Sequence, residues 1–188
     1  MRVAKKWNNN SLLTLNFDYN NITLDEPNNE YHIDGIDNDK LIQEVLENQD
    51  TKLDADPTQS HFEDSVVLDT ETSAHLLYEV DCIIKKNVDP FLKQDGHWAH
   101  IIHPHQSTMY HNHMKSGLGV SWVYWLKYPE YSGKLIFDFH ILDFRVSLGF
   151  EPKVGTLLLF PTWIPHYTTR NVSNDTRISI SGNHSRNK

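Results

Sequence analysis

Residues 152–183 read PKVGTLLLFPTWIPHYTTRNVSNDTRISISGN, and this stretch holds two strand-like runs separated by a proline-rich turn. The run GTLLLF is apolar and ends at Pro161, whereas the run RISIS begins at Arg177 and alternates polar with apolar residues. Pro165 stiffens the approach to His166, because the proline ring fixes its backbone φ angle. Short strands bounded by turn residues are typical of β-sandwiches and barrels, so the stretch predicts a sheet in this part of the chain.

Strand-like runs also follow one another upstream, from Trp98 onward. They are WAHIIHP, GVSWVYWLKY, GKLIFDFH and LDFRVSL, and each is bounded by Gly, Pro, Asn or Asp. Their close spacing favours a mainly β fold with flanking helices, and a jelly roll is the most specific architecture that it indicates.

The amino-terminal half has a mixed pattern. The run SLLTLNFDYNN alternates and predicts an early strand, while DNDKLIQEVLENQ predicts a helix with Asp37 or Asn38 as its N-cap. A longer helix is expected over about residues 73–92, where apolar residues recur at helical spacing. Residues 48–65 are acidic and polar and are expected to form a loop.

One domain is expected for the 188 residues, because a chain of this length buries a core without disulfides. Within it, residues 1–95 would form a mixed α/β support region and residues 96–184 the β core. The single cysteine, Cys82, cannot form an internal disulfide, which favours a reducing compartment. The first residues lack the apolar segment of a secretory signal, and no apolar run approaches the roughly 18 residues that cross a membrane. A cytoplasmic protein is therefore expected.

The net charge is −8, from 17 basic and 25 acidic residues. Sequence-independent binding to nucleic acid depends on Lys and Arg that neutralise phosphates, so this balance argues against it.

Histidines gather in one part of the chain, since six of the twelve lie between His97 and His113. On a strand, residues two apart share a face, so His111 and His113 would aim into one space with Asn112 turned away. Two neutral imidazoles suit a borderline metal such as Fe(II), Zn or Mn, but two ligands do not define a site. A metal pair and a pair of polar residues at a strand mouth both remain open at this point. The other four histidines of the cluster are expected to be exposed or hydrogen-bonded polar residues: His97, His100, His103 and His105.

The order HNH, then PKVGTLLLFP, then PH, then RISIS resembles the Fe(II)- and 2-oxoglutarate-dependent oxygenases, over roughly residues 98–183. The likeness is greatest to the prolyl-hydroxylase-related group of that superfamily, which has bacterial and phage members. The resemblance implies a double-stranded β-helix, that is, a cupin-like jelly roll. A phage-encoded protein that acts in the host cytoplasm is compatible with it.

The resemblance implies a role for each matching residue. His111 would be the first iron ligand and His166 the distal ligand, while Arg177 would hold the far carboxylate of 2-oxoglutarate with a hydrogen bond from Ser179. A guanidinium fork suits a carboxylate because it binds both oxygens at once.

One wall of the pocket is expected to come from the strand after the HNH motif. Ser121 and Trp125 would face the co-substrate, with Val123 on the same face of the strand. A slip of one residue exchanges the two faces. In that register the wall would be formed by Trp122, Tyr124 and Leu126.

The departure from the family pattern is His113, which stands where an aspartate is expected. Three explanations are open. The metal is held by three histidines, or by a carboxylate from elsewhere such as Asp138 or Asp143, or the site is degenerate or binds another metal. Three histidines leave the site one unit more positive than the usual two histidines and one carboxylate.

The resemblance implies an Fe(II)- and 2-oxoglutarate-dependent dioxygenase, most simply a hydroxylase, that converts 2-oxoglutarate and O2 to succinate and CO2. The primary substrate would be a prolyl or other peptide side chain, or a small molecule. One alternative is a cupin-like enzyme with three histidines and no 2-oxoglutarate, against which Arg177 with Ser179 argues. Another is a non-catalytic β-sandwich module for binding or structure. The sequence leaves the oligomeric state open.

Overall fold

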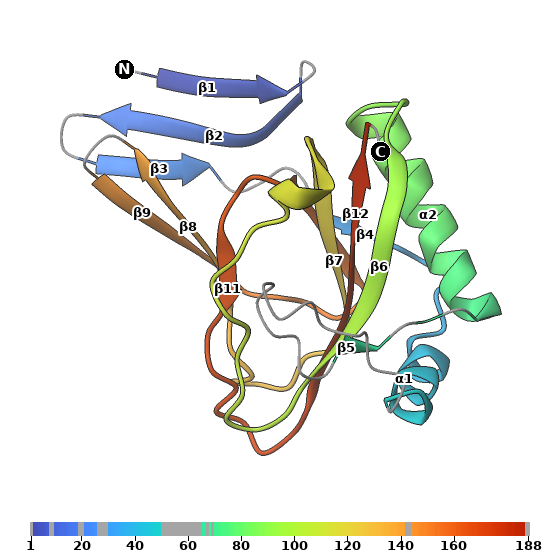
Figure 1. Ribbon diagram of the computed structural model, residues 1–188. Helices are drawn as coiled ribbons and strands as arrows, with labels where there is room; N and C mark the ends of the chain where they lie inside the picture. The colour runs from blue at the N-terminus through green and yellow to red at the C-terminus, as the bar shows by residue number, and fades with distance from the viewer. Residues whose placement is uncertain are drawn as a thin grey trace.

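The computed structural model describes residues 2–7, 10–18, 21–25, 30–49, 65–66, 68, 70–141 and 144–186. Figure 1 shows strands through the centre of the molecule, with α1 (Asn38–Glu47) and α2 (Glu71–Asn87) together on one side. Most of the loop expected over residues 48–65 falls outside the described residues. No helix in the described ranges is both long and apolar enough to span a membrane.

A six-stranded antiparallel sheet forms the centre of the fold. In spatial order its strands are β4 (Glu30–His32), β10 (Thr156–Pro161), β7 (Gly119–Lys127), β12 (Arg177–Ser185), β6 (Lys93–Ile102) and β5 (Ser65–Val66). The strands predicted from WAHIIHP, GVSWVYWLKY, GTLLLF and RISIS are confirmed as β6, β7, β10 and β12. The neighbours of β12 are β6 and β7, so strands distant in sequence meet at the middle of the sheet.

A smaller sheet contains β11 (His166–Thr168), β8 (Leu135–Ile141) and β9 (Phe144–Phe150), in that order. The strands predicted from GKLIFDFH and LDFRVSL are confirmed as β8 and β9. Apolar side chains from both sheets pack against one another, including Trp125 and Phe160 of the large sheet and Phe137 of the small one. Two facing antiparallel sheets with a common core are the arrangement expected for a double-stranded β-helix.

The two helices begin at capping residues. Asp37 caps α1 as the sequence predicts, because its carboxylate accepts a hydrogen bond from the Lys40 N–H at 3.0 Å. Thr70 caps α2 in a capping box with Ser73. The predicted extension of this second helix to residue 92 is wrong, since α2 ends at Asn87. Pro90 lacks a backbone N–H and restricts the residue before it, so the helix does not continue through it.

Alternation along β7 sends its side chains to two different cores. Trp122, Tyr124 and Leu126 pack with the helices, whereas Val123 and Trp125 pack between the two sheets. This is the first of the two registers that the sequence left open. β7 therefore has one face for the helices and one for the space enclosed by the sheets.

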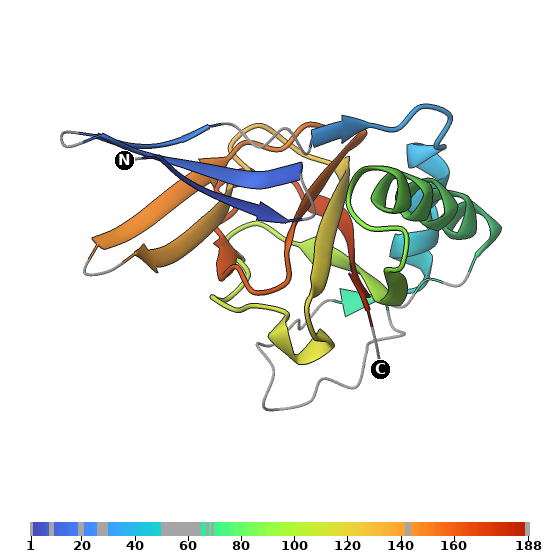
Figure 2. The same cartoon turned by 90° about the horizontal axis from the view of Figure 1, so that it is seen from above.

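The amino-terminal residues form a third, antiparallel sheet of β1 (Arg2–Trp7), β2 (Asn10–Asp18) and β3 (Asn21–Asp25). The early strand predicted from SLLTLNFDYNN is confirmed as β2. In both Figure 1 and Figure 2 this sheet lies on the side of the molecule that carries β8 and β9. β4 and β5 also come from the amino-terminal half but join the large sheet, and the division near residue 95 stays a prediction.

Candidate functional site

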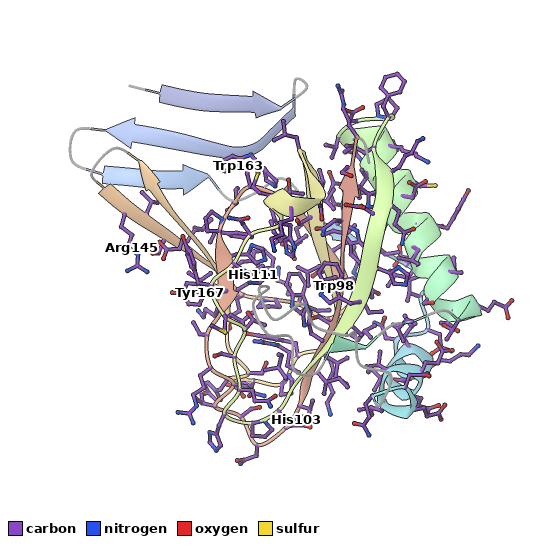
Figure 3. All side chains as sticks on the ribbon, in the orientation of Figure 1. Trp98, His103, His111, Arg145, Trp163 and Tyr167 are labelled. Atoms are coloured by element: carbon purple, nitrogen blue, oxygen red, sulfur yellow. The ribbon has the colours of Figure 1, made fainter. Side chains whose placement is uncertain are left out.

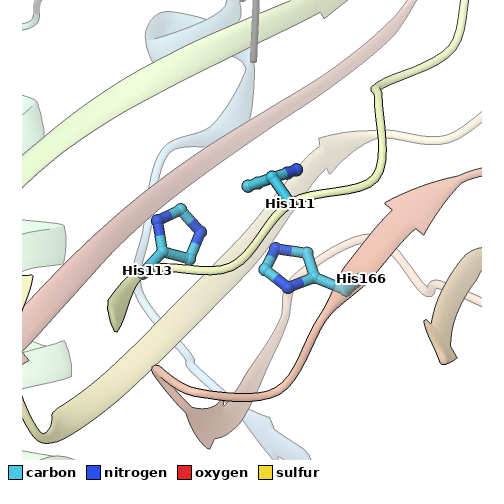
Figure 4. Close-up of side chains that lie close together, drawn as sticks. All are labelled: His111, His113 and His166. Atoms are coloured by element: carbon cyan, nitrogen blue, oxygen red, sulfur yellow. The ribbon is translucent and has the colours of Figure 1, made fainter. Parts of the chain in front are cut away.

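Three histidines from two separate segments meet at the edge of the small sheet. His166 begins β11, His111 forms an isolated bridge with it, and His113 precedes the short 3-10 helix η1 (Met114–Ser116). One ring nitrogen from each histidine lies within 4.8 Å of the others, and the three side chains lie together in Figure 4. The sequence separation of 55 residues between the first and last of them is closed by the backbone pairing of His111 with His166.

Backbone hydrogen bonds hold this segment in place. The His111 N–H donates to the His166 carbonyl at 3.0 Å, and the His166 N–H donates back to the His111 carbonyl at 2.8 Å. The His113 N–H donates to the Thr162 carbonyl at 2.8 Å. The expectation that both His111 and His113 lie on one regular strand is therefore wrong, because the chain turns into η1 directly after His113. The two rings still converge, with centroids 5.0 Å apart.

Two of the rings have their tautomer set by a carbonyl. His111 Nδ1 lies 2.7 Å from the Met109 carbonyl oxygen, and His166 Nδ1 lies 3.0 Å from that of Ile164. A carbonyl only accepts, so each Nδ1 carries the proton and donates, and each Nε2 keeps its lone pair. Metal-binding histidines in proteins are commonly oriented by such a bond from the other ring nitrogen.

Burial keeps the three rings neutral. It is the main reason that the pKa of His111 falls below its usual value and that the pKa of His166 falls well below it. Burial, followed by the neighbouring His111 and His100, lowers the pKa of His113 to about 3. Three neutral imidazoles within reach of one point are a donor set that fits Fe(II) among other borderline metals.

Asp138 does not belong to this cluster. Its carboxylate accepts hydrogen bonds from Arg145 Nε at 3.0 Å to each oxygen and from the Ser147 hydroxyl at 3.2 Å. Figure 3 shows Arg145 at the edge of the molecule, away from His111. Asp143, the other carboxylate considered from sequence, lies outside the described residues. Among the described residues the group that could hold a metal consists of the three histidines alone.

Arg177 lies in the same pocket, at the start of β12. Only 3% of its surface is exposed, and burial lowers the pKa of the guanidinium to about 10, so it remains charged near neutral pH. It donates from Nη1 to the Ser132 carbonyl at 2.6 Å and from Nη2 to the Thr168 hydroxyl at 2.9 Å. Both acceptors are neutral, and no carboxylate of the described residues forms an ion pair with it.

The carbonyls of Ser132 and Gly133, which both accept hydrogen bonds from Arg177, belong to a turn that depends on Gly133. Its φ is +93°, and a Cβ there would lie 2.3 Å from the Thr169 carbonyl oxygen. Only glycine fits such a position without displacing backbone. The Gly133 carbonyl itself accepts a second bond from Arg177 Nη1 at 3.2 Å.

One pocket contains both the histidine cluster and Arg177. Ser179 and Trp125 line it together with Val123, whereas the Ser121 hydroxyl donates to Asn183 at 2.8 Å and Ser121 is not among the lining residues. The described residues that line the pocket are Trp98, His100, Ile102, Thr108, His111, His113, Trp122, Val123, Trp125, Leu135, Pro152, Phe160, His166, Thr168, Arg177, Ser179 and Ser181.

His100 was expected to be an exposed or hydrogen-bonded polar residue; it is hydrogen-bonded to Trp98, but it also lines the pocket and is only 8% exposed. Thr168, which contacts Arg177, was not anticipated at all. The signal for His100 was available, because it is two residues from Trp98 and two from Ile102, and all three share one face of β6. No signal in the sequence pointed to Thr168.

Comparison with known proteins gives a family match over part of the chain and a fold. Residues 142–183 match the model of the family described as "Putative 2OG-Fe(II) oxygenase". This segment contains three of the residues expected to form the site: His166, Arg177 and Ser179. No curated protein sequence matches the chain significantly.

Solved structures with the same architecture include a prolyl-4-hydroxylase from Pseudomonas putida, with a TM-score of 0.63 and 16% identity, covering 85% of this chain and 94% of that one. The chain has the fold of the 2-oxoglutarate- and iron-dependent oxygenases. The matched segment contains the PH and RISIS motifs, and the fold agrees with the resemblance seen in them; the HNH motif lies outside the matched segment.

Two further structures show how varied the proteins of this fold are. A viral collagen prolyl hydroxylase from Paramecium Bursaria Chlorella virus-1, in complex with 2OG, has a TM-score of 0.58 at 15% identity, over 82% of this chain and 94% of that one. The epimerase SnoN, in complex with Fe3+, alpha ketoglutarate and nogalamycin RO, has a TM-score of 0.63 at 12% identity, over 83% and 78%. The same architecture thus occurs in proteins named for two different reactions.

Proposed function

We propose that the whole chain forms one Fe(II)- and 2-oxoglutarate-dependent oxygenase domain. The observation that carries this proposal is the presence of three neutral histidines and a buried, charged arginine in one pocket. The family match and the fold point in the same direction.

In this proposal His111, His113 and His166 hold the iron through Nε2 of His111 and His166 and one ring nitrogen of His113. The carbonyls of Met109 and Ile164 keep two of these rings in the binding tautomer. Iron in such a site supplies the activation of O2 that couples oxidation of 2-oxoglutarate to oxidation of a substrate C–H bond.

Arg177 anchors the far carboxylate of 2-oxoglutarate. A buried cation whose partners among the described residues are neutral is poorly compensated, and a bound carboxylate compensates it. Ser132, Gly133 and Thr168 fix the guanidinium before the co-substrate arrives, so little conformational freedom is lost on binding. Ser179, two residues along the same face of β12, adds a hydroxyl to this end of the pocket.

The three-histidine set changes the charge of the site but not its capacity for the co-substrate. Fe(II) with three neutral ligands is doubly positive, and the dianionic co-substrate neutralises it. With a carboxylate ligand the same complex would carry one negative charge. His113 therefore makes the site more attractive to anions than the usual triad.

The overall reaction would join 2-oxoglutarate, O2 and a C–H bond to give succinate, CO2 and a hydroxylated product. One oxygen atom enters succinate and the other enters the product. A prolyl or other peptide side chain is the first substrate class to test, because two of the similar structures are prolyl hydroxylases. Action in the cytoplasm remains part of the proposal.

The competing function on the same fold is a three-histidine metalloenzyme that uses no 2-oxoglutarate. The buried charge of Arg177 and its place in the same pocket argue against it, because such an enzyme needs no co-substrate carboxylate for that residue to hold.

The test is co-substrate turnover in the absence of a known primary substrate. Purified protein with Fe(II), ascorbate and 2-oxoglutarate in air should form succinate and CO2 slowly and in equal amounts. Omission of iron or oxygen should abolish both products. A protein that binds iron but forms no succinate, alone or with a panel of prolyl peptides, would contradict the proposal.

A further inference from the structure

His113 is held differently from the other two histidines of the cluster. The backbones of His111 and His166 pair with each other, and each of these rings is oriented by a carbonyl at Nδ1. In the part of the chain that the structure describes, the His113 ring forms no such hydrogen bond and only contacts other rings, among them His166 at a centroid distance of 5.1 Å. His113 also lies on a coil segment, whereas His166 begins a strand (Figure 4). The place of the His113 ring therefore depends on the backbone that carries it.

Thr162 holds that backbone through its own main chain. Its carbonyl accepts a hydrogen bond from the His113 N–H at 2.8 Å, and its N–H donates to the Gly119 carbonyl at 3.1 Å. These bonds engage both ends of the segment that runs from His113 through η1 to the start of β7. Thr162 is fully buried and lies in the turn after β10, four residues before His166. One residue thus connects the segment of His113 to that of His166.

The side chain of Thr162 adds two hydrogen bonds to the same segment. Its hydroxyl donates to the Gly117 carbonyl at 2.8 Å and accepts from the Gly119 N–H at 3.2 Å. A hydroxyl is both a donor and an acceptor, so it satisfies the two backbone groups at once. Gly117 follows η1 with a φ of +86°, a conformation that favours glycine, and the bond from Thr162 fixes the carbonyl of this residue.

We propose that Thr162 is a positioning residue of the metal centre, which holds residues 113–119 so that the His113 ring meets the other two histidines before iron binds. This inference rests on the proposed function of the pocket, because that function makes His113 an iron ligand. A ligand that is already in its binding geometry loses less conformational freedom when the metal binds. The Thr162 hydroxyl should therefore contribute to iron affinity and not only to folding.

The first test measures Fe(II) affinity under anaerobic conditions, by competition with a chelator. Thr162→Val keeps the shape of the side chain and removes the hydroxyl. It should weaken iron binding by about 10-fold, the lower end of the roughly 10- to 100-fold range for outer partners of metal ligands. Thr162→Ser keeps the hydroxyl and should bind iron within about threefold of the wild type.

Thr156→Val is the matched control. Thr156 is also a buried threonine, at the start of β10, and its hydroxyl donates to the Lys153 carbonyl at 2.7 Å. Both valine variants lose a threonine hydroxyl that binds a carbonyl, and thermal unfolding should show a lower melting temperature for each. Only Thr162→Val should lose iron affinity, because Thr156 has no contact with residues 113–119 among its hydrogen bonds.

The second test is amide hydrogen exchange of the metal-free protein, resolved by residue with NMR. In the wild type the amides of His113 and Gly119 should be protected without iron, because Thr162 accepts from both. In Thr162→Val the Gly119 amide loses its acceptor and should exchange faster, whereas Thr156→Val should leave it unchanged. The wild-type measurement tests the inference even if Thr162→Val does not fold.

Three results would overturn the inference and leave the proposed function intact. They are iron affinity in Thr162→Val equal to that of Thr156→Val, a loss that Thr162→Ser does not restore, and unprotected His113 and Gly119 amides in the metal-free wild type. If the wild-type protein binds no iron at all, the proposed function fails and the inference fails with it.

Discussion

The two faces of the large sheet are built from the same strands but differ in almost every physical respect. On the helix side, β7 and β12 contribute Tyr124, Leu126, Ile178 and other apolar side chains that are at most 2% exposed. On the pocket side, the alternate positions of β12 are Arg177 and Ser179. Because side chains alternate along a strand, β12 has apolar core residues on one face and the pocket residues Arg177 and Ser179 on the other.

Because of this difference, we expect mutations to separate the stability of the domain from ligand binding by the pocket. Side chains on the helix face contribute through apolar area and close packing. On β12 the pocket-face residues Arg177 and Ser179 are polar and add little apolar area, whereas Val123 and Trp125 of β7 also contribute to the core between the sheets. Substitutions on one face should therefore change stability, and those on the other should change ligand binding.

The largest effect is expected at the histidine cluster. His166→Ala should abolish stoichiometric iron binding, because two remaining ligands do not define a site. The variant should still fold, which circular dichroism would check. His75→Ala, on the exposed side of α2 and outside the cluster, is the control and should bind iron like the wild type. Iron bound normally by His166→Ala would place the metal elsewhere.

A helix-face substitution should have the converse effect. Leu126→Ala removes a fully buried side chain and should lower the free energy of unfolding by about 2–5 kcal/mol. Urea denaturation measures this loss, and calorimetry on the folded variant should give unchanged affinities for iron and 2-oxoglutarate. Parallel loss of stability and ligand affinity would show that the two faces are not independent.

Arg177→Ala separates the two ligands of the pocket. It should weaken 2-oxoglutarate binding by about 100-fold, as expected for loss of hydrogen bonds between charged groups of up to about 3 kcal/mol. Iron content should stay close to that of the wild type. Arg177→Lys should lie between, because an ammonium keeps the charge but not the planar fork. An equal loss of iron and 2-oxoglutarate in Arg177→Ala contradicts the assigned role.

Substitutions of His113 distinguish the three explanations for a histidine at the position where an aspartate ligand is expected. His113→Ala also leaves only two histidines, so it should lower iron affinity by more than the roughly 10- to 100-fold expected for loss of an outer hydrogen-bond partner of a metal ligand. His113→Asp should retain iron, because it creates two histidines and one carboxylate. Unchanged iron affinity in His113→Ala would mean that a carboxylate outside the described residues is the third ligand.

The smallest effect is a dependence of stability on pH in the metal-free protein. The pKa values of His100 and His113 are about 3 in the folded state, below the unfolded value of about 6.5, so the unfolded chain binds more protons between these values. Stability is therefore unaffected by these groups above about pH 6.5 and should fall as the pH drops from there toward 3. Each group should contribute a slope of at most about 1.4 kcal/mol per pH unit. Thermal unfolding of metal-free protein from pH 7 to pH 5 measures it, and His100→Leu should show a shallower slope.

The sequence predicted the sheet because alternation and turn residues are local signals. The runs that the pattern marked overlap β6, β7, β10 and β12, although β6 begins earlier, at Lys93, and β12 continues to Ser185. His111, His166 and Arg177 could also be predicted as site residues, because their order along the chain resembles that of the oxygenase motifs. β11 was missed because its three residues are too few to show a period.

The remaining features depend on contacts between distant residues. Arg145 donates hydrogen bonds to the Asp138 carboxylate, which excludes Asp138 as the third metal ligand. In the sequence, neither residue can be told from an ordinary surface charge. The place of His100 beside Ser179 follows from the pairing of β6 with β12, which no local pattern specifies. Local sequence therefore predicts which face a residue occupies, and the strand order determines which residues share the pocket.

The central claim is that the pocket binds one iron through its three histidines and one 2-oxoglutarate through Arg177. An anaerobic titration of the wild-type protein with Fe(II) and then 2-oxoglutarate tests it directly. We expect one iron and one 2-oxoglutarate per chain, with a weak visible charge-transfer band that appears only when both are present. Iron binding without the band would favour the three-histidine enzyme that uses no 2-oxoglutarate, and binding of neither ligand would contradict both enzymatic functions.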